Sequence, residues 1–141
     1  MEVVPMSQSE VQPGRLVVLT EPECWELVRT QPVGRVAWAG TEGISVVPVN
    51  FLADDGGIVL RTTPYSLLAR DSAEREVAFQ VDHVDPDSHE GWSVLLRGRC
   101  HRVRAGDERP ETWVTGARTL DLRVEVTSVS GRRVVSPTTA G

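Results

Sequence analysis

Short apolar segments separated by turn sequences constrain this chain more than any other feature. Three β-type runs follow one another at 35–39, 44–52 and 58–62. The segments between them, Gly40-Thr41-Glu42-Gly43 and Asp54-Asp55-Gly56-Gly57, have compositions typical of hairpin turns. This order predicts a meander of three antiparallel strands. Pro48 interrupts the second run, and because proline cannot donate to a strand ladder, it indicates an edge or a bulge there.

Further β-type runs and a few short helices complete the predicted elements. Thr20 and Glu23 form a capping-box sequence, with Pro22 in the first turn, and predict a helix that runs to about Thr30. Helical patterns also occur at 65–70 and 107–119, and strand patterns at 76–82, 92–103 and 121–129. The last is followed at 130–134 by a turn and an edge pairing. Six or so strands joined by hairpins favour a closed barrel over an open sandwich. We therefore expect a mainly β protein, a six-stranded antiparallel barrel with a few short helices.

Length and composition predict one cytoplasmic domain. The 141 residues suffice for one core but not for two. Residues 1–14 are polar and aperiodic and are expected to form a flexible arm, with a single domain at 15–141. No apolar stretch approaches the roughly 18 residues of a membrane span, and no export signal is visible. The net charge of −5 disfavours nonspecific nucleic-acid binding, so neither nucleic acid nor membrane is an expected partner.

Cysteine and metal chemistry are not expected. Cys24 and Cys100 lack metal-type or disulfide-type spacing and are interpreted as reduced core residues. His101 follows Cys100 on a predicted strand, where neighbouring side chains point to opposite faces, so the two are not a nucleophile and its base. The acidic and histidine-containing loop at 83–90 matches no zinc motif and is interpreted as a solvated loop, so no metal is expected.

The most informative polar cluster is Arg61-Thr62-Thr63, followed by Tyr65-Ser66 at the start of a predicted helix. An arginine fork, hydroxyl groups and helix N-terminal amides together suit a phosphate monoester. The alternative interpretation is a solvated strand end with an ordinary helix cap. All fifteen basic residues are arginine, so any phosphate contact must come from arginine, hydroxyls or backbone amides.

Seven short motifs occur in a defined order along most of the chain. They are Leu19-Thr20-Glu21-Pro22-Glu23, Val33-Gly34-Arg35-Val36, Val47-Pro48-Val49-Asn50-Phe51, Leu60-Arg61-Thr62, 77–82 (VAFQVD), 91–94 (GWSV) with Arg97-Gly98, and Ser130-Gly131-Arg132-Arg133. This order resembles the pyridoxamine 5′-phosphate oxidase-like family, especially its small bacterial branch that includes nitroimidazole-reductase-like proteins. Each motif is short, and the specificity lies in their order and spacing.

The resemblance implies an FMN-binding split barrel that forms a homodimer with the flavin at the subunit interface. It places the phosphate at Arg61, Thr62, Thr63 and the following turn with Ser66, the flavin ring against the backbone of Val47, Pro48, Val49 and Asn50, and Trp92 and Ser93 near the ring or ribityl chain. Backbone amides near the ring would stabilise negative charge on the reduced flavin. The partner subunit is an alternative source of the tryptophan and serine.

One position departs from the family pattern. Relatives usually place a lysine after the Arg-Thr turn, where this chain has Leu67, and Arg70, one helical turn from Ser66, is the alternative cation. The implied activity is FMN-dependent oxidation or reduction of a small organic substrate, with a nicotinamide nucleotide as electron donor. The departure keeps two alternatives open: a noncatalytic module that binds flavin, deazaflavin or haem, and a degenerate barrel without cofactor. Oxidation of pyridoxamine 5′-phosphate itself is not expected, since no second cluster suits the substrate phosphate.

Overall fold

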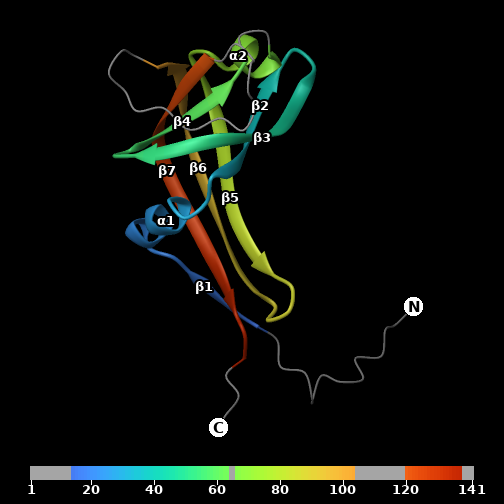
Figure 1. Ribbon diagram of the computed structural model, residues 1–141, viewed down its shortest axis with the longest axis vertical. Coiled ribbons are helices and arrows are strands. Elements are labelled where there is room, and N and C mark those ends of the chain that lie inside the picture. Colours follow the sequence, from blue (N-terminus) through green and yellow to red (C-terminus); the bar gives the residue numbers. More distant parts are fainter. Residues whose placement is uncertain (1–13, 64–65, 104–119, 138–141) are drawn as a thin grey trace, which may run out of the picture.

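The computed structural model describes residues 14–63, 66–103 and 120–137, which form seven strands and two helices (Figure 1). The strands are β1 (Arg15–Val18), β2 (Val33–Gly40), β3 (Gly43–Asp54), β4 (Gly57–Thr62), β5 (Arg75–Asp85), β6 (Glu90–Arg102) and β7 (Leu120–Val135). The helices are α1 (Glu21–Val28) and α2 (Leu67–Ser72). Residues 1–13 of the predicted arm at 1–14 and the predicted helix at 107–119 lie outside the described residues.

Six of the strands close into an antiparallel ring. The sheet has the order β1-β7-β4-β3-β2-β5-β6, and β6 also pairs with β7, so β2 to β7 form a closed barrel with β1 added beside β7. The hairpin of β5 and β6 extends beyond the ring together with the end of β7 and with β1, toward the bottom of Figure 1. The expected six-stranded split barrel is confirmed, and β1 is a strand that the sequence analysis missed.

The first half of β3 is an edge, as Pro48 predicted. All of 43–50 pairs with β2, with Pro48 opposite Arg35. Pairing with β4 involves only Phe51–Asp54, so within the described part of the chain the other side of 43–50 has no strand partner. The barrel is therefore open along this half-strand, and a proline is tolerated there because no ladder hydrogen bond is lost on the open side.

Strand β7 is longer than predicted. We expected a turn and an edge pairing at 130–134. The pairing is present, but in place of the turn these residues continue the strand, paired with β6 throughout and with β1 from Arg132 onward. A register shift opposite Arg97 and Gly98 leaves Thr127 as the extra residue, and such a bulge increases the twist of a strand. The long strand is therefore part of both the barrel and its extension.

The core fills the barrel with side chains from alternate strand positions. Phe79 is fully buried and contacts Phe51 edge to face, with ring centroids 4.9 Å apart. Gly34 makes room for this ring, since a Cβ at that position would lie 2.3 Å from Phe79 Cζ. Cys24 and Cys100 are buried free thiols, as predicted.

Each of the two helices begins directly after its N-cap residue. Thr20 accepts from the amide of Glu23 while the Glu23 carboxylate accepts from the amide of Thr20, which confirms the capping box, although α1 ends at Val28 instead of Thr30. Ser66 is the N-cap of α2, whose helical residues begin one position later. This second helix packs on β2 and β5 at the end of the barrel that is uppermost in Figure 1. Neither described helix has the length and apolarity required to cross a membrane.

Candidate functional site

A groove of about 690 Å³ lies between the open edge of β3 and the connection from β4 to α2. The residues that line it are Trp38, Ser45, Val46, Val47, Pro48, Val49, Arg61, Thr62, Thr63, Ser66, Leu67 and Leu68. Its volume lies within the range of small-molecule and cofactor sites. The strand break at Pro48 and the turn after Thr62 thus border the same hollow, although they are separate in the sequence.

The groove has an apolar wall. Trp38 and Leu68 are buried beneath it, while Leu67 is half-buried and Val46 is exposed to 59%. Because 43–50 has no strand partner on this side among the described residues, backbone N–H and C=O groups of the edge are also available to a ligand. This wall suits a ring that is apolar on its faces and polar at its rim.

The opposite end of the groove carries a short chain of hydroxyl hydrogen bonds. Thr62 Oγ1 donates to Ser66 Oγ at 2.9 Å, and Ser66 Oγ also accepts from the amide of Ala69 at 3.0 Å. Since the Ser66 hydroxyl accepts twice, its own hydrogen remains for donation to a ligand. Thr63 adds a further exposed hydroxyl.

Arg61 lies at this polar end and is held by a buried carboxylate. Its Nε lies 2.9 Å from Asp121 Oδ1 and its Nη2 lies 3.1 Å from Oδ2, a bidentate contact across β4 and β7. The side chains are exposed to 17% and 2% respectively. The hydrogen bond to Asp121 raises the pKa of Arg61, with burial acting in the opposite direction, so the arginine stays charged. The pair fixes the guanidinium at the rim of the groove.

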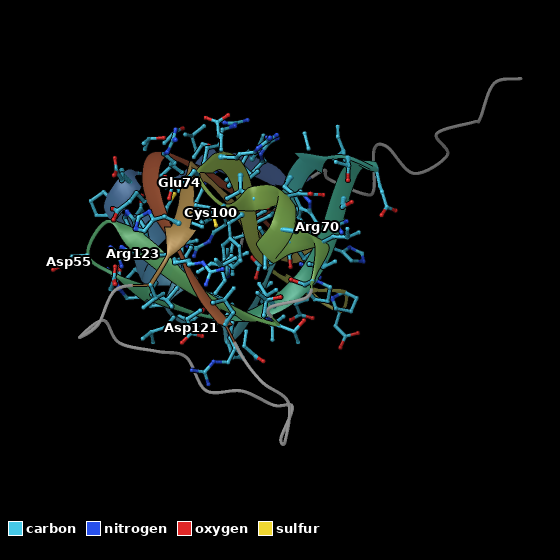
Figure 2. All side chains as sticks on the ribbon, turned by 90° about the horizontal axis from the view of Figure 1, so that it is seen from above. Asp55, Arg70, Glu74, Cys100, Asp121 and Arg123 are labelled. Carbon is cyan, nitrogen blue, oxygen red and sulfur yellow. The ribbon has the colours of Figure 1, made fainter. Side chains whose placement is uncertain are left out.

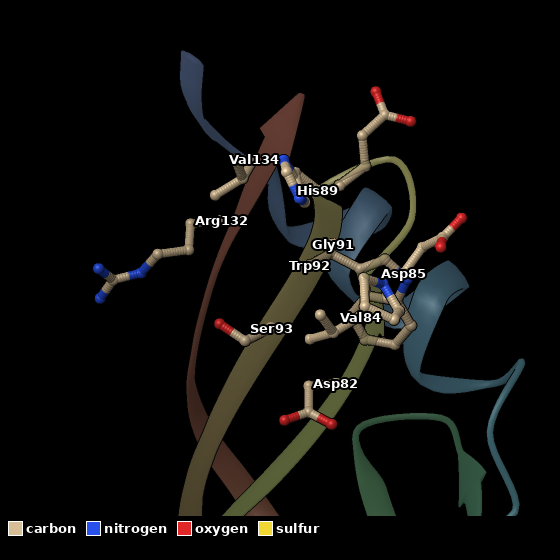
Figure 3. A pocket seen from close by; sticks show the side chains of 11 residues that line it. Asp82, Val84, Asp85, His89, Gly91, Trp92, Ser93, Arg132 and Val134 are labelled. Atoms are coloured by element: carbon tan, nitrogen blue, oxygen red, sulfur yellow. The ribbon is translucent and has the colours of Figure 1, made fainter. Parts of the chain in front are cut away.

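A second, mostly apolar hollow of about 340 Å³ lies on the barrel extension (Figure 3). Ser93 stands between Asp82 and Arg132 in one cross-strand row, and Gly91 stands between Val84 and Val134 in the next. Trp92 also borders this hollow and packs partly against the core. The two hollows share no described lining residue.

The structure separates the residues that the sequence grouped as cofactor-binding. The groove brings together Val47, Pro48, Val49, Arg61, Thr62, Thr63 and Ser66. Trp92 and Ser93 border the second hollow, and Asn50 lines neither. Arg70 also lies outside the groove: its side chain is exposed to 67%, it pairs with Asp71 at 3.7 Å, and Figure 2 shows it well apart from Asp121.

Asp121 is the residue of this site that the sequence analysis missed. We had placed it only as the first residue of a strand, without a functional role. A carboxylate at the start of an apolar strand is a weak signal of burial, and its partner lies sixty positions away in the sequence. Only the pairing of β4 with β7, which sets Arg61 opposite Asp121, brings the two together.

The Cys100 thiol and the three histidines lie outside the groove lining. Burial raises the pKa of the Cys100 thiol to about 12, with a smaller contribution from Glu74, so the thiol stays protonated at neutral pH. None of the three histidines, His83, His89 and His101, lines the groove. In the described part of the chain, no group of three or more metal-type side chains is placed to hold an ion.

Comparison with known proteins agrees with this fold. Residues 20–133 match the model of the pyridoxamine 5′-phosphate oxidase family. The uncharacterized protein Rv0080 of Mycobacterium tuberculosis is 29% identical over 143 residues, covering 94% of this chain and 91% of that protein.

Solved structures are similar as well, among them two FAD-binding proteins. The FAD-binding protein from Mycobacterium smegmatis has a TM-score of 0.69 and 28% identity, covering 84% of this chain and 98% of that one. An FAD-binding protein from Mesorhizobium loti has a TM-score of 0.69 at 19% identity, covering 87% and 99%, and shows the fold alone. The ring of six strands with its open edge defines a split-barrel protein. The chain belongs to the pyridoxamine 5′-phosphate oxidase-like family.

Proposed function

We propose that this protein binds a flavin, FMN or FAD, in the groove between β3 and α2, and acts as an oxidoreductase on a small organic substrate. One observation carries the proposal: a single groove joins an apolar wall to an end with a guanidinium and hydroxyls. Membership of the family and the 28% identity to the FAD-binding protein from Mycobacterium smegmatis support it.

Different residues of the groove bind the ring and the phosphate of the cofactor. The ring lies against Val47 and Pro48, while Arg61 and Ser66 donate to phosphate. Pro48 itself has no N–H, and its immediate neighbours direct their amides toward β2, so amides at other positions of the open edge are the ones that would stabilise negative charge at the rim of the ring. When bound, the flavin supplies the two-electron chemistry, with a nicotinamide nucleotide as the electron donor. A dedicated acid or base from the protein is therefore not required.

A titration tests the proposed site. We expect FMN, FAD and riboflavin each to quench tryptophan fluorescence saturably, with one ligand per chain, because Trp38 lies in the groove wall. Haem serves as the comparison ligand, since no histidine borders the groove. Failure of all three flavins to bind, or selective binding of haem, contradicts the proposal.

A gain-of-function variant locates the phosphate. Leu67→Lys places a cation beside Arg61 and Ser66, and we expect it to strengthen FMN binding about tenfold, the scale of one added charge contact. Riboflavin binding stays within about threefold of the wild type, because riboflavin has no phosphate. Leu27→Lys, another half-buried helical leucine that lies outside the groove, is the control and leaves FMN affinity unchanged. Equal effects of the two variants would place the phosphate elsewhere.

We further propose that two chains form a symmetric dimer that joins the groove of one to the second hollow of the other. Support comes from exposed apolar side chains beside both hollows, since a monomer rarely leaves such groups uncovered. Ile44 and Val46, exposed to 82% and 59%, flank the groove on β3. Leu16, Val18, Val84 and Val134 lie on the outer face of the barrel extension around the second hollow. A two-fold axis that pairs these patches would bring Trp92 and Ser93 of one chain to the groove of its partner.

Sedimentation of two charge variants tests the dimer. The wild type is expected to sediment as a dimer at micromolar concentration. Ile44→Glu and Val84→Asp each introduce a charge into an apolar contact and are expected to shift it toward the monomer, with weaker flavin binding. Glu76→Lys, on the exposed side of β5, is the control and leaves the mass unchanged. A monomeric wild type that binds flavin with full stoichiometry would overturn the shared site.

A further inference from the structure

The two sides of the groove, the open edge of β3 and the helix α2, are joined by a contact between α2 and the turn of the β2–β3 hairpin. Asp71 Oδ2 accepts two hydrogen bonds from Thr41, one from the backbone amide at 3.4 Å and one from Oγ1 at 3.3 Å. The Asp71 side chain is exposed to only 9%. The helix lies beside this hairpin at the top of Figure 1. The contact is not part of the groove lining, but both of its elements continue into that lining.

Gly40 makes room for this contact. A Cβ at position 40 would lie 2.5 Å from Asp71 Oδ2 and 3.0 Å from Asp71 Cγ, and its three nearest tertiary contacts all belong to Asp71. Gly40 stands opposite Gly43 at the end of the β2–β3 ladder. The carboxylate therefore lies directly against the backbone of the hairpin while the turn donates to it.

Helix α2 carries groove residues on the side that Asp71 occupies. Leu67 and Asp71 are four positions apart, and such pairs share one face of a helix. Leu67 lines the groove, and the fully buried Leu68 anchors the helix in the core. A shift of α2 relative to the hairpin would therefore also move Leu67 and the N-cap Ser66.

The turn that donates these hydrogen bonds begins the open edge of β3. Its last ladder pair is Gly40–Gly43, and the pair Trp38–Ser45, two residues further along, lines the groove. The contact thus lies about 7 Å along the strands from the nearest lining pair. Since 43–50 has a strand partner on only one side among the described residues, a contact at its start limits how far this edge can move away from α2.

We propose that Asp71 is a positioning residue of the flavin site: it holds the β2–β3 turn against α2 and so keeps the two sides of the groove at the spacing that fits the ring. The inference rests on the proposed flavin site. Asp71 does not touch the cofactor and acts through the edge of β3 and through α2. Such preorganisation raises affinity because the two sides are already ordered when the ligand binds.

Removal of the carboxylate is expected to weaken the binding of every flavin. In Asp71→Ala the affinity for riboflavin should fall about tenfold, the scale of one or two hydrogen bonds, and FMN and FAD should lose at least as much. The loss should come mainly from faster dissociation in stopped-flow measurements. Loss of a phosphate contact alone, in contrast, would leave riboflavin affinity unchanged. In the ligand-free variant, amide hydrogen exchange within 41–46 should be faster than in the wild type.

Two further variants test the contact itself. Asp71→Asn keeps an oxygen that can accept from Thr41, and it should retain riboflavin affinity within about threefold of the wild type. Gly40→Ala displaces the carboxylate from the hairpin and should weaken riboflavin binding as Asp71→Ala does. Added to Asp71→Ala, it should cause no further loss of affinity, because the two changes remove the same contact.

Glu23→Ala is the matched control, because the Glu23 carboxylate also accepts from a threonine amide, at 2.8 Å, but caps α1 and lines neither hollow. It should lower the stability of the protein without changing flavin affinity. Arg70→Ala removes only the exposed partner of Asp71 Oδ1 and should also leave affinity unchanged. Thermal unfolding and sedimentation check that each variant is folded and keeps the mass of the wild type.

The outcomes separate this inference from the proposed function. A riboflavin affinity of Asp71→Ala within about threefold of the wild type overturns the positioning role and leaves the flavin site standing. An equal loss in Glu23→Ala also overturns it, since the effect would then follow from stability alone. If the wild type binds none of the three flavins, the flavin site itself is wrong, and the role of Asp71 is wrong with it. Should Asp71→Ala not fold, Gly40→Ala decides in its place.

Discussion

Replacing Arg61 with alanine is expected to weaken both phosphate binding and the fold. FMN and FAD affinities should fall about 100-fold, because a charged hydrogen-bond donor is lost while the negative Asp121 stays behind the site. Riboflavin affinity should change by no more than about threefold, since the ring contacts on β3 remain. The free energy of unfolding should fall by about 3 kcal/mol, because a carboxylate exposed to only 2% loses its bidentate partner. Flavin titration and urea denaturation measure the two effects.

Arg70→Ala is the control for this variant. It removes the other arginine that the sequence placed near the phosphate, but the structure positions that side chain outside the groove and largely in solvent. Flavin affinity and stability should therefore stay close to the wild-type values. If Arg70→Ala weakens FMN binding as strongly as Arg61→Ala, the phosphate lies nearer α2 than we propose.

Replacing Phe79 with alanine should produce the largest loss of stability. The ring is fully buried in the barrel and contacts Phe51, so its removal leaves a cavity with few ways to collapse. We expect the free energy of unfolding to fall by about 3–5 kcal/mol in urea denaturation. Phe79→Leu, which retains most of the volume, should cost about 1.5 kcal/mol. Glu76→Ala, at an exposed position of the same strand, should remain within about 0.5 kcal/mol of the wild type.

A double-mutant cycle tests the packing that this result depends on. Gly34→Ala alone should destabilise the protein, because its Cβ would meet the edge of the Phe79 ring. Combined with Phe79→Ala, the same methyl group enters the cavity, and most of its cost should disappear; the remainder comes from the Gln80 carbonyl oxygen, 3.1 Å from the added Cβ. If the losses of unfolding free energy from Gly34→Ala and Phe79→Ala simply add, glycine is required at position 34 for a reason other than its contact with Phe79.

Several features of the fold were predictable because short-range chemistry determines them. The capping box at Thr20 and Glu23, the hairpin turns around β3 and the edge at Pro48 each depend on residues within a few positions of one another. Strand β1 and the uninterrupted course of β7 through Gly131 were not predicted, although an edge pairing of 130–134 was. A four-residue strand has too little pattern of its own, and it exists because β7 offers an edge.

In the candidate site, too, the local features were predictable from the sequence and their arrangement in space was not. The sequence by itself determined which residues could take part: a proline-broken strand, an arginine followed by hydroxyls, and a tryptophan-serine pair. The resemblance placed all three around one cofactor. Only the tertiary structure showed that the first two border one groove, set the third on a separate hollow, and placed Asp121 behind Arg61. The physical reason is that closure of the barrel pairs β4 with β7 across some sixty residues of chain, and no local pattern encodes that register.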